Sequence, residues 1–126
     1  MGEPIRSYED LAAWQKSYDL VLEVFRVTAM FPRDERFGLT QQIRRAAVSI
    51  PSHVAEGWGR GASKEFRRFL SIARGSAYEL QTQLRLTRDL DMVADGEEIV
   101  GLLRRVGEVE RIVNGLIRSI KLEDQR

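Results

Sequence analysis

The chain has 126 residues, of which 20 are Lys or Arg and 19 are Asp or Glu, and its net charge is +1. It contains no cysteine, which excludes disulfides and thiolate chemistry and suits a reducing compartment. The N-terminal residues lack the apolar core of a secretion signal, and no apolar run approaches the roughly 20 residues that cross a bilayer, so we expect one cytoplasmic domain over residues 1–126, away from membranes.

The first predicted helix covers about residues 8–30, with Ser7 and Asp10 at capping-box spacing. Two apolar sets lie on nearly opposite faces of it: Leu11, Trp14, Tyr18, Val21 and Phe25 form one, and Ala13, Leu20, Val24 and Val27 form the other. A helix that is apolar on two faces usually contacts two neighbours, one of which can be another subunit. This pattern favours a closed homo-oligomer.

The second predicted helix covers about residues 40–58. Its apolar face consists of Ile43, Ala46, Ala47, Ile50 and Val54. Pro51 lies inside this pattern, and because the periodicity resumes at Val54 we expect a kink rather than an end. Gly57, Gly59 and Gly61 then end the helix.

The third predicted helix covers about residues 64–91, with Ser63 as its N-cap. Its inner face consists of Phe66, Phe69, Leu70, Ala73, Ala77, Leu80 and Leu84. Gly75 and Ser76 lie in mid-helix, where Gly costs about 1 kcal/mol relative to Ala. We therefore expect close helix packing at this point.

The fourth predicted helix covers about residues 96–121, with Asp95 as N-cap and Glu98 completing a capping box. Apolar residues recur along it at spacings of three and four: Ile99, Leu102, Val106, Val109, Val113, Leu116 and Ile120. Four amphipathic helices joined by short loops predict an all-α fold, an antiparallel up-down-up-down four-helix bundle.

Charge is distributed unevenly along the chain. Residues 36–74 carry only two acidic side chains, Glu56 and Glu65, against eight basic ones: Arg36, Arg44, Arg45, Arg60, Lys64, Arg67, Arg68 and Arg74. Both flanking segments carry more acidic than basic residues. Because local charge predicts polyanion binding better than net charge does, this block is a candidate phosphate-binding surface.

Helical spacing places Arg67, Arg74 and Arg85 within about 20° of one another on the third helix, beside Tyr78 and with no acidic residue on the same stripe. Arginine suits phosphate oxygens, and a neighbouring aromatic ring can stack on a base. The proposed nucleic-acid contacts are Arg44, Arg45, Arg60, Lys64, Arg67, Arg68, Arg74 and Arg85. The alternatives are a solvated helix face or salt bridges between subunits.

Other motifs favour structural roles. Residues 57–64 share only their composition with a phosphate loop, and no strand precedes them, so a helix–helix turn is expected. His53 is the only histidine, and Glu56 is spaced to pair with Arg60. We expect no metal site, no cofactor and no catalytic activity.

The middle of the chain resembles a known family. The runs FGL, QIRRAAVSIP, AEG, R-G-x-S-K-EF and FLSIA-GS, within residues 11–90, closely resemble the proteins encoded in intervening sequences of bacterial 23S ribosomal RNA genes. The same fold family includes the accessory variability protein of diversity-generating retroelements. One departure is His53, where that family usually has Asn.

The resemblance implies an antiparallel four-helix bundle assembled as a homopentamer, with a basic surface for nucleic acid. We therefore expect non-catalytic binding of RNA or DNA phosphates. The alternative is an oligomeric adaptor for a protein partner, such as a reverse-transcriptase-like protein.

Overall fold

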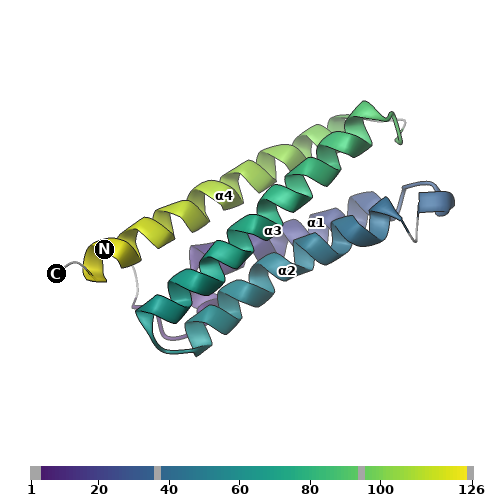
Figure 1. Cartoon of the computed structure of the whole chain (residues 1–126). Coiled ribbons are helices and arrows are strands. Elements are labelled where there is room, and N and C mark those ends of the chain that lie inside the picture. The colour runs from purple at the N-terminus through teal and green to yellow at the C-terminus, as the bar shows by residue number, and fades with distance from the viewer. Residues whose placement is uncertain (1–3, 36–37, 94–95, 125–126) are drawn as a thin grey trace.

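Four α-helices make up most of the molecule (Figure 1). The structure is a computed structural model that describes residues 4–35, 38–93 and 96–124, with only the backbone of Glu35 and of residues 122–124. The helices are α1 (Ala12–Thr28), α2 (Leu39–Gly59), α3 (Ser63–Asp89) and α4 (Gly96–Asp124). The described residues contain no strand, which confirms the predicted all-α class. Within the same residues, no helix has the length and hydropathy needed to cross a bilayer.

The helices lie lengthwise beside one another (Figure 1), and each contacts the next in the chain, while α4 also contacts α1. The helices α2 and α3 are antiparallel to each other. The Ser49 and Ser76 hydroxyls are 2.8 Å apart, and Gly57 lies against Phe66 near the joint. Two ion pairs join α1 to α4: Lys16–Glu108 and Arg26–Glu98.

The first helix begins later than the sequence predicts. The capping box is present, since the Ser7 hydroxyl accepts from the Glu9 N–H and the Asp10 carboxylate accepts from the Ser7 N–H. It closes only a single 3₁₀ turn, Tyr8–Asp10. Leu11 then has extended backbone and becomes the N-cap of α1. The predicted start at residue 8 is therefore wrong because the cap stabilises a separate turn.

The start of α3 also differs from the prediction. Ala62, with extended backbone, is the N-cap of α3, and Ser63 is already its first helical residue. No side chain caps this end. The predicted N-cap of the fourth helix, Asp95, lies outside the described residues. The continuation of α2 past Pro51 is confirmed, since this residue lies inside Leu39–Gly59.

One apolar core runs through the bundle, formed largely by the predicted faces. All five predicted residues of α2 are buried. On α3, Phe66 is only partly buried, while the six others of the predicted face are buried. On α4, Leu116 is partly buried and its neighbour Ile117 is buried in its place. The spacing of apolar residues therefore identified nearly the whole core of these three helices.

The two apolar faces of α1 have different environments. Ala13, Leu20, Val24 and Val27 are buried in the core. On the other predicted face, Leu11 is buried and Trp14 and Val21 are partly buried. Tyr18 and Phe25 are exposed to 46% and 41%, and the adjacent Leu22, which the prediction did not include, is exposed to 56%. We call these three residues, together with Trp14 and Val48 beside them, the outer apolar face. Among the described residues, Arg44 lies over the Phe25 ring and Tyr8 packs against Trp14, and the remaining surface of Tyr18 and Leu22 is exposed.

The helices α2 and α3 pack closely against each other at Gly57. A Cβ atom built on this buried glycine would lie 2.6 Å from the Phe69 Cβ and 3.1 Å from a Phe66 ring carbon. Real Cβ atoms essentially never come within 3.0 Å of another heavy atom. Glycine is therefore required at position 57. The close packing predicted at Gly75 is wrong, since a Cβ there would meet no atom within 4 Å.

These two glycines predict opposite effects of the same substitution. Gly57→Ala should lower the free energy of unfolding by about 1–3 kcal/mol because it overpacks the α2–α3 contact. Gly75→Ala is the matched control and should raise it by up to about 1 kcal/mol because alanine favours the helix. Urea unfolding followed by circular dichroism measures both. Equal effects of the two substitutions would contradict the close approach at Gly57.

Candidate nucleic-acid interface

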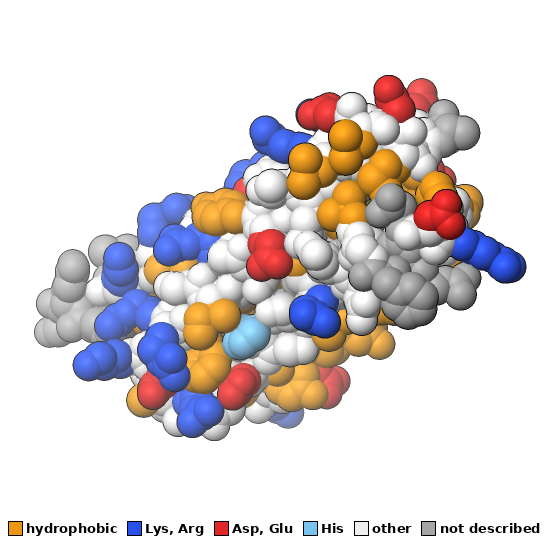
Figure 2. All heavy atoms as spheres, turned by 45° about the vertical axis from the view of Figure 1, so that its right-hand side comes forward, with side chains coloured by type: hydrophobic (Ala, Val, Ile, Leu, Met, Phe, Trp, Pro, Cys, Tyr) orange, Lys and Arg blue, Asp and Glu red, His pale blue; other side chains and the backbone are white. Residues whose placement is uncertain are grey.

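A groove of about 490 Å³ lies between the first turns of α3 and the last turns of α4. We call it the basic groove, because five of its eight lining residues are cationic and one is acidic: Lys64, Glu65, Arg67, Arg68, Ser71, Arg74, Ile117 and Lys121. Figure 2 shows Lys and Arg side chains gathered over the left half of the face in view, with few acidic side chains among them. The groove therefore concentrates positive charge in a chain of nearly zero net charge.

The amphipathic pattern of α3 produces this arrangement. Phe69, Leu70 and Ala73 turn inward to the core. Polar and charged residues next to these in sequence recur every three or four positions, and this second face of the helix lies toward α4. Lys64 and Arg74 come to this side from α3, and Lys121 reaches the same groove from α4.

The cations of the groove differ in whether they form hydrogen bonds or ion pairs with other side chains. The Arg68 Nε donates to the Glu65 carboxylate at 2.9 Å, and this hydrogen bond holds the pKa of Glu65 below its ordinary value. The Arg74 Nη1 donates to the Asn114 side-chain oxygen at 3.0 Å. Lys64 and Lys121 form no ion pair with any side chain that the structure describes. The two lysines are therefore the most available positive charges.

Arg60 lies beside the groove rather than in it. Its Nη2 pairs with Glu56 at 3.1 Å, as the sequence spacing predicts. Its guanidinium also lies 5.1 Å from the centre of the Phe69 ring, and that of Arg68 lies 4.7 Å from the same ring. Two cations of this end of the bundle are thus positioned by one buried aromatic side chain.

Three more of the predicted contacts, in addition to Arg60, do not line the groove, so the eight predicted residues do not form one surface. Arg44 donates its Nε to the Thr28 hydroxyl at 2.8 Å and lies over the Phe25 ring, which places it between α2 and α1. Arg45 is exposed on α2, and Arg85 is exposed on α3, about 16 Å along the helix from Arg74. Arg36 lies outside the described residues.

Glu110 weakens the positive charge around Arg85. This carboxylate is half-buried on α4, and its Oε2 has no hydrogen-bond partner among the described groups. Burial raises its pKa, and the charges of Arg85 and Arg111 partly offset this effect. Arg85 therefore faces a carboxylate rather than open solvent alone, unlike the stripe that the α3 sequence predicts.

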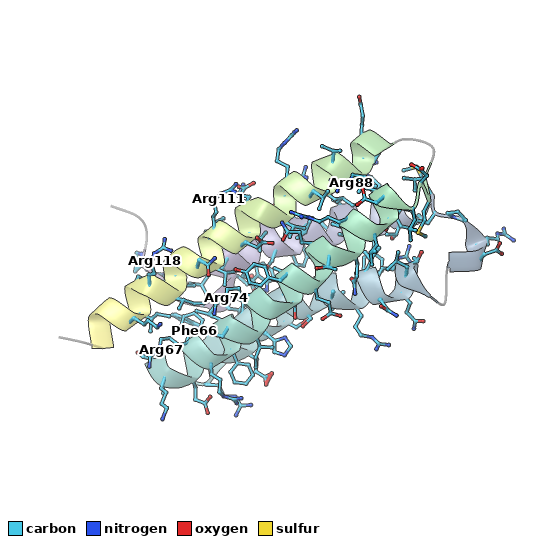
Figure 3. All side chains as sticks on the ribbon, turned by 45° about the horizontal axis from the view of Figure 1, so that its top comes forward. Phe66, Arg67, Arg74, Arg88, Arg111 and Arg118 are labelled. Atoms are coloured by element: carbon cyan, nitrogen blue, oxygen red, sulfur yellow. The ribbon has the colours of Figure 1, made fainter. Side chains whose placement is uncertain are left out.

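Basic residues of α4 were missed by the sequence reasoning. Lys121 lines the groove, and Arg104, Arg111 and Arg118 are exposed on the same helix. The sequence does contain a pattern that could have identified them, because these three arginines recur every seven residues and so share one helix face. Figure 3 shows Arg111 and Arg118 along α4, with Arg67 and Arg74 along α3.

The joint between α2 and α3 is a tight helix–helix turn, as predicted. Gly61 has φ of +80°, a left-handed conformation that favours glycine. Nearby, the Nδ1 of His53 lies 2.8 Å from the Ser49 carbonyl oxygen and 2.9 Å from its hydroxyl, and the ring stacks on Phe69. Among the described residues, no three His, Asp or Glu side chains are grouped as metal ligands would be.

Comparisons with known proteins agree with this architecture. A family model described as 23S rRNA-intervening sequence protein matches residues 9–115. A crystal structure of a protein with unknown function from the S23 ribosomal protein family of Bacteroides thetaiotaomicron VPI-5482 superposes with a TM-score of 0.77 at 19% identity. The match covers 84% of this chain and 98% of that one, and at this identity it shows the fold alone. No match was found among curated proteins. Because the family model spans most of the described helices, the chain belongs to the 23S rRNA-intervening sequence protein family.

Proposed function

We propose that this protein is a non-catalytic, oligomeric nucleic-acid-binding protein whose basic groove contacts the phosphates of RNA or DNA. The observation that carries the proposal is the lining of the groove, with five cations and one carboxylate. Lys64 and Lys121 have no ion pair within the described part of the chain, so their ammonium groups remain available to phosphate oxygens. Contacts of this kind position a nucleic acid without reading its sequence.

The arginines of the groove support the same role. Arg74 uses one nitrogen to donate to Asn114. A guanidinium carries five N–H donors, so the remaining ones can bind a phosphate while the first holds the side chain in place. An arginine fixed in this way loses less conformational freedom on binding than a free one.

We also propose that the chain is an up-down-up-down bundle and that copies of it assemble through the outer apolar face. The α2–α3 pairing at Ser49–Ser76 and Gly57–Phe66 supports the first proposal. Exposed apolar side chains clustered on α1 support the second, because contiguous apolar patches on soluble proteins commonly mark interfaces. A closed ring, with five subunits expected, would repeat the groove and strengthen binding through several simultaneous contacts.

A second candidate function uses the same outer apolar face. If a different protein covers that face, the chain acts as an adaptor, with a reverse-transcriptase-like protein as one possible partner. The exposed Tyr18, Leu22 and Phe25 are the observation that favours it. The two functions differ in what covers α1 and in whether the groove binds phosphate.

Removing charge from the groove should weaken binding in a salt-dependent way. The variant Lys64→Gln/Lys121→Gln should bind RNA and DNA more weakly regardless of sequence. Its slope of log affinity against log salt should decrease in magnitude by about 2, about 1 for each lysine that contacts a phosphate. Fluorescence anisotropy over a salt series measures both quantities.

The matched control removes two exposed charges elsewhere, Arg33→Gln/Arg105→Gln, and should leave the slope unchanged. Equal losses in the two variants would show that only overall charge matters. No binding by the wild-type protein at low salt would rule out the nucleic-acid function.

Charges placed on the outer apolar face should separate the subunits. Tyr18→Glu/Leu22→Glu should convert the oligomer to a folded monomer, since both side chains are half-exposed in a single chain and their loss does not open the core. Light scattering coupled to gel filtration measures the mass, and circular dichroism checks helicity. Gln42→Glu/Thr82→Glu, which adds the same charge at other exposed positions, should leave the mass unchanged. A wild-type protein that is monomeric at every concentration would refute self-assembly and favour the adaptor.

A further inference from the structure

A second cavity lies at the same end of the bundle as the basic groove. Its volume is about 540 Å³, and its walls are mainly apolar, with Trp58, Phe66, Leu116 and Ile120 among the lining residues. We call it the aromatic pocket. The rings of Trp58 and Phe66 meet edge to face, with centroids 6.0 Å apart, and both side chains are only half-buried. Two aromatic side chains are thus partly accessible within a concave apolar surface.

The aromatic pocket and the basic groove share the same helix turns. On α3, Ser63 and Phe66 line the pocket, whereas Lys64 and Arg67 line the groove. On α4, Leu116 and Ile120 line the pocket, whereas their next neighbours Ile117 and Lys121 line the groove. The two cavities therefore lie on either side of one pair of helix ends, within about the 10 Å width of a helix.

The pocket has an open wall at the joint. For Gly61, which lines it, no atom of the described residues outside its chain neighbours lies within 4 Å of the position a Cβ would occupy. A flat aromatic group could enter there and contact the Trp58 and Phe66 rings in an offset or edge-on arrangement. Nucleobases are such groups, and proteins that bind single strands combine a cationic track for the backbone with aromatic side chains for the bases.

We propose that the aromatic pocket takes an unpaired nucleobase from the same strand whose phosphates occupy the basic groove. This inference rests on the phosphate-binding function proposed above and specifies its substrate class. A base inside a duplex is paired and stacked, so it cannot reach the pocket. The protein therefore selects single-stranded nucleic acid, or a single-stranded loop of a folded RNA, over duplex.

The test uses Trp58 as its own probe. Trp14 and Trp58 are the only tryptophans, so Trp14→Phe leaves Trp58 as the sole tryptophan. This variant is titrated at one salt concentration with a single-stranded oligonucleotide, the duplex of the same sequence and an abasic strand of the same length. Anisotropy reports binding of each labelled probe, and tryptophan fluorescence reports the pocket.

The expected result is that the single strand binds about tenfold more tightly than the abasic strand and quenches Trp58, whereas the abasic strand leaves the fluorescence unchanged. Trp58→Leu should reduce affinity for the single strand about tenfold and leave affinity for the abasic strand unchanged. If Trp58→Leu loses its helicity, the pocket is tested by Trp58 fluorescence in the Trp14→Phe variant alone.

Three results would overturn the inference in different ways. Equal affinity for all three probes without a change in Trp58 fluorescence would refute the base pocket and leave the phosphate groove intact. Absence of binding by all three at low salt would refute the groove and the pocket together. A changed oligomer mass in folded Trp58→Leu would assign the pocket to a contact between copies of the chain and so also refute it.

Discussion

The close approach of α2 and α3 at Gly57 is the constraint on which the rest of the structure depends. With no side chain at this position, the Phe69 Cβ lies only 2.6 Å from where another residue would place its own Cβ. The Phe69 side chain is buried there, and the groups around it include Arg60, Arg68 and His53. One apolar contact in the core therefore fixes the start of α3 and orients two cations at the surface.

Once the start of α3 is fixed, its helical period determines where the charges lie. The inward turn of Phe69, Leu70 and Ala73 directs Lys64 and Arg74 toward α4, where Lys121 completes the basic groove. Some of the positive charge is neutralised within the helices, since Arg60 pairs with Glu56 and Arg68 with Glu65. Lys64 and Lys121, which form no ion pair with a described side chain, therefore matter more for phosphate binding than the number of cations suggests.

The outer apolar face and the groove belong to different parts of the molecule. The first lies along α1 and the adjoining side of α2, and the second lies between α3 and α4. Assembly through α1, as proposed, would leave α3 and α4 open to a ligand. A partner that covers only the outer apolar face can thus bind without blocking access of a polyanion to the basic groove.

Much of the fold was determined by the sequence alone, because helical periodicity depends only on local spacing. The spacing of apolar residues identified the four helices and nearly all the buried hydrophobic residues of α2, α3 and α4. It also showed that α1 is apolar on two faces. It could not tell which face is buried, because Leu20 and Tyr18 differ in environment only through what packs against them.

The candidate site needed the tertiary structure, because a groove forms between helices that are distant in the chain. The sequence placed Lys64, Arg67, Arg68 and Arg74 in one block, and all four line the basic groove. It could not show that Arg44 is held by Thr28 on α1, or that Lys121 reaches the groove from α4. Local spacing therefore determined which charges share a helix face, and only helix packing decided which faces meet.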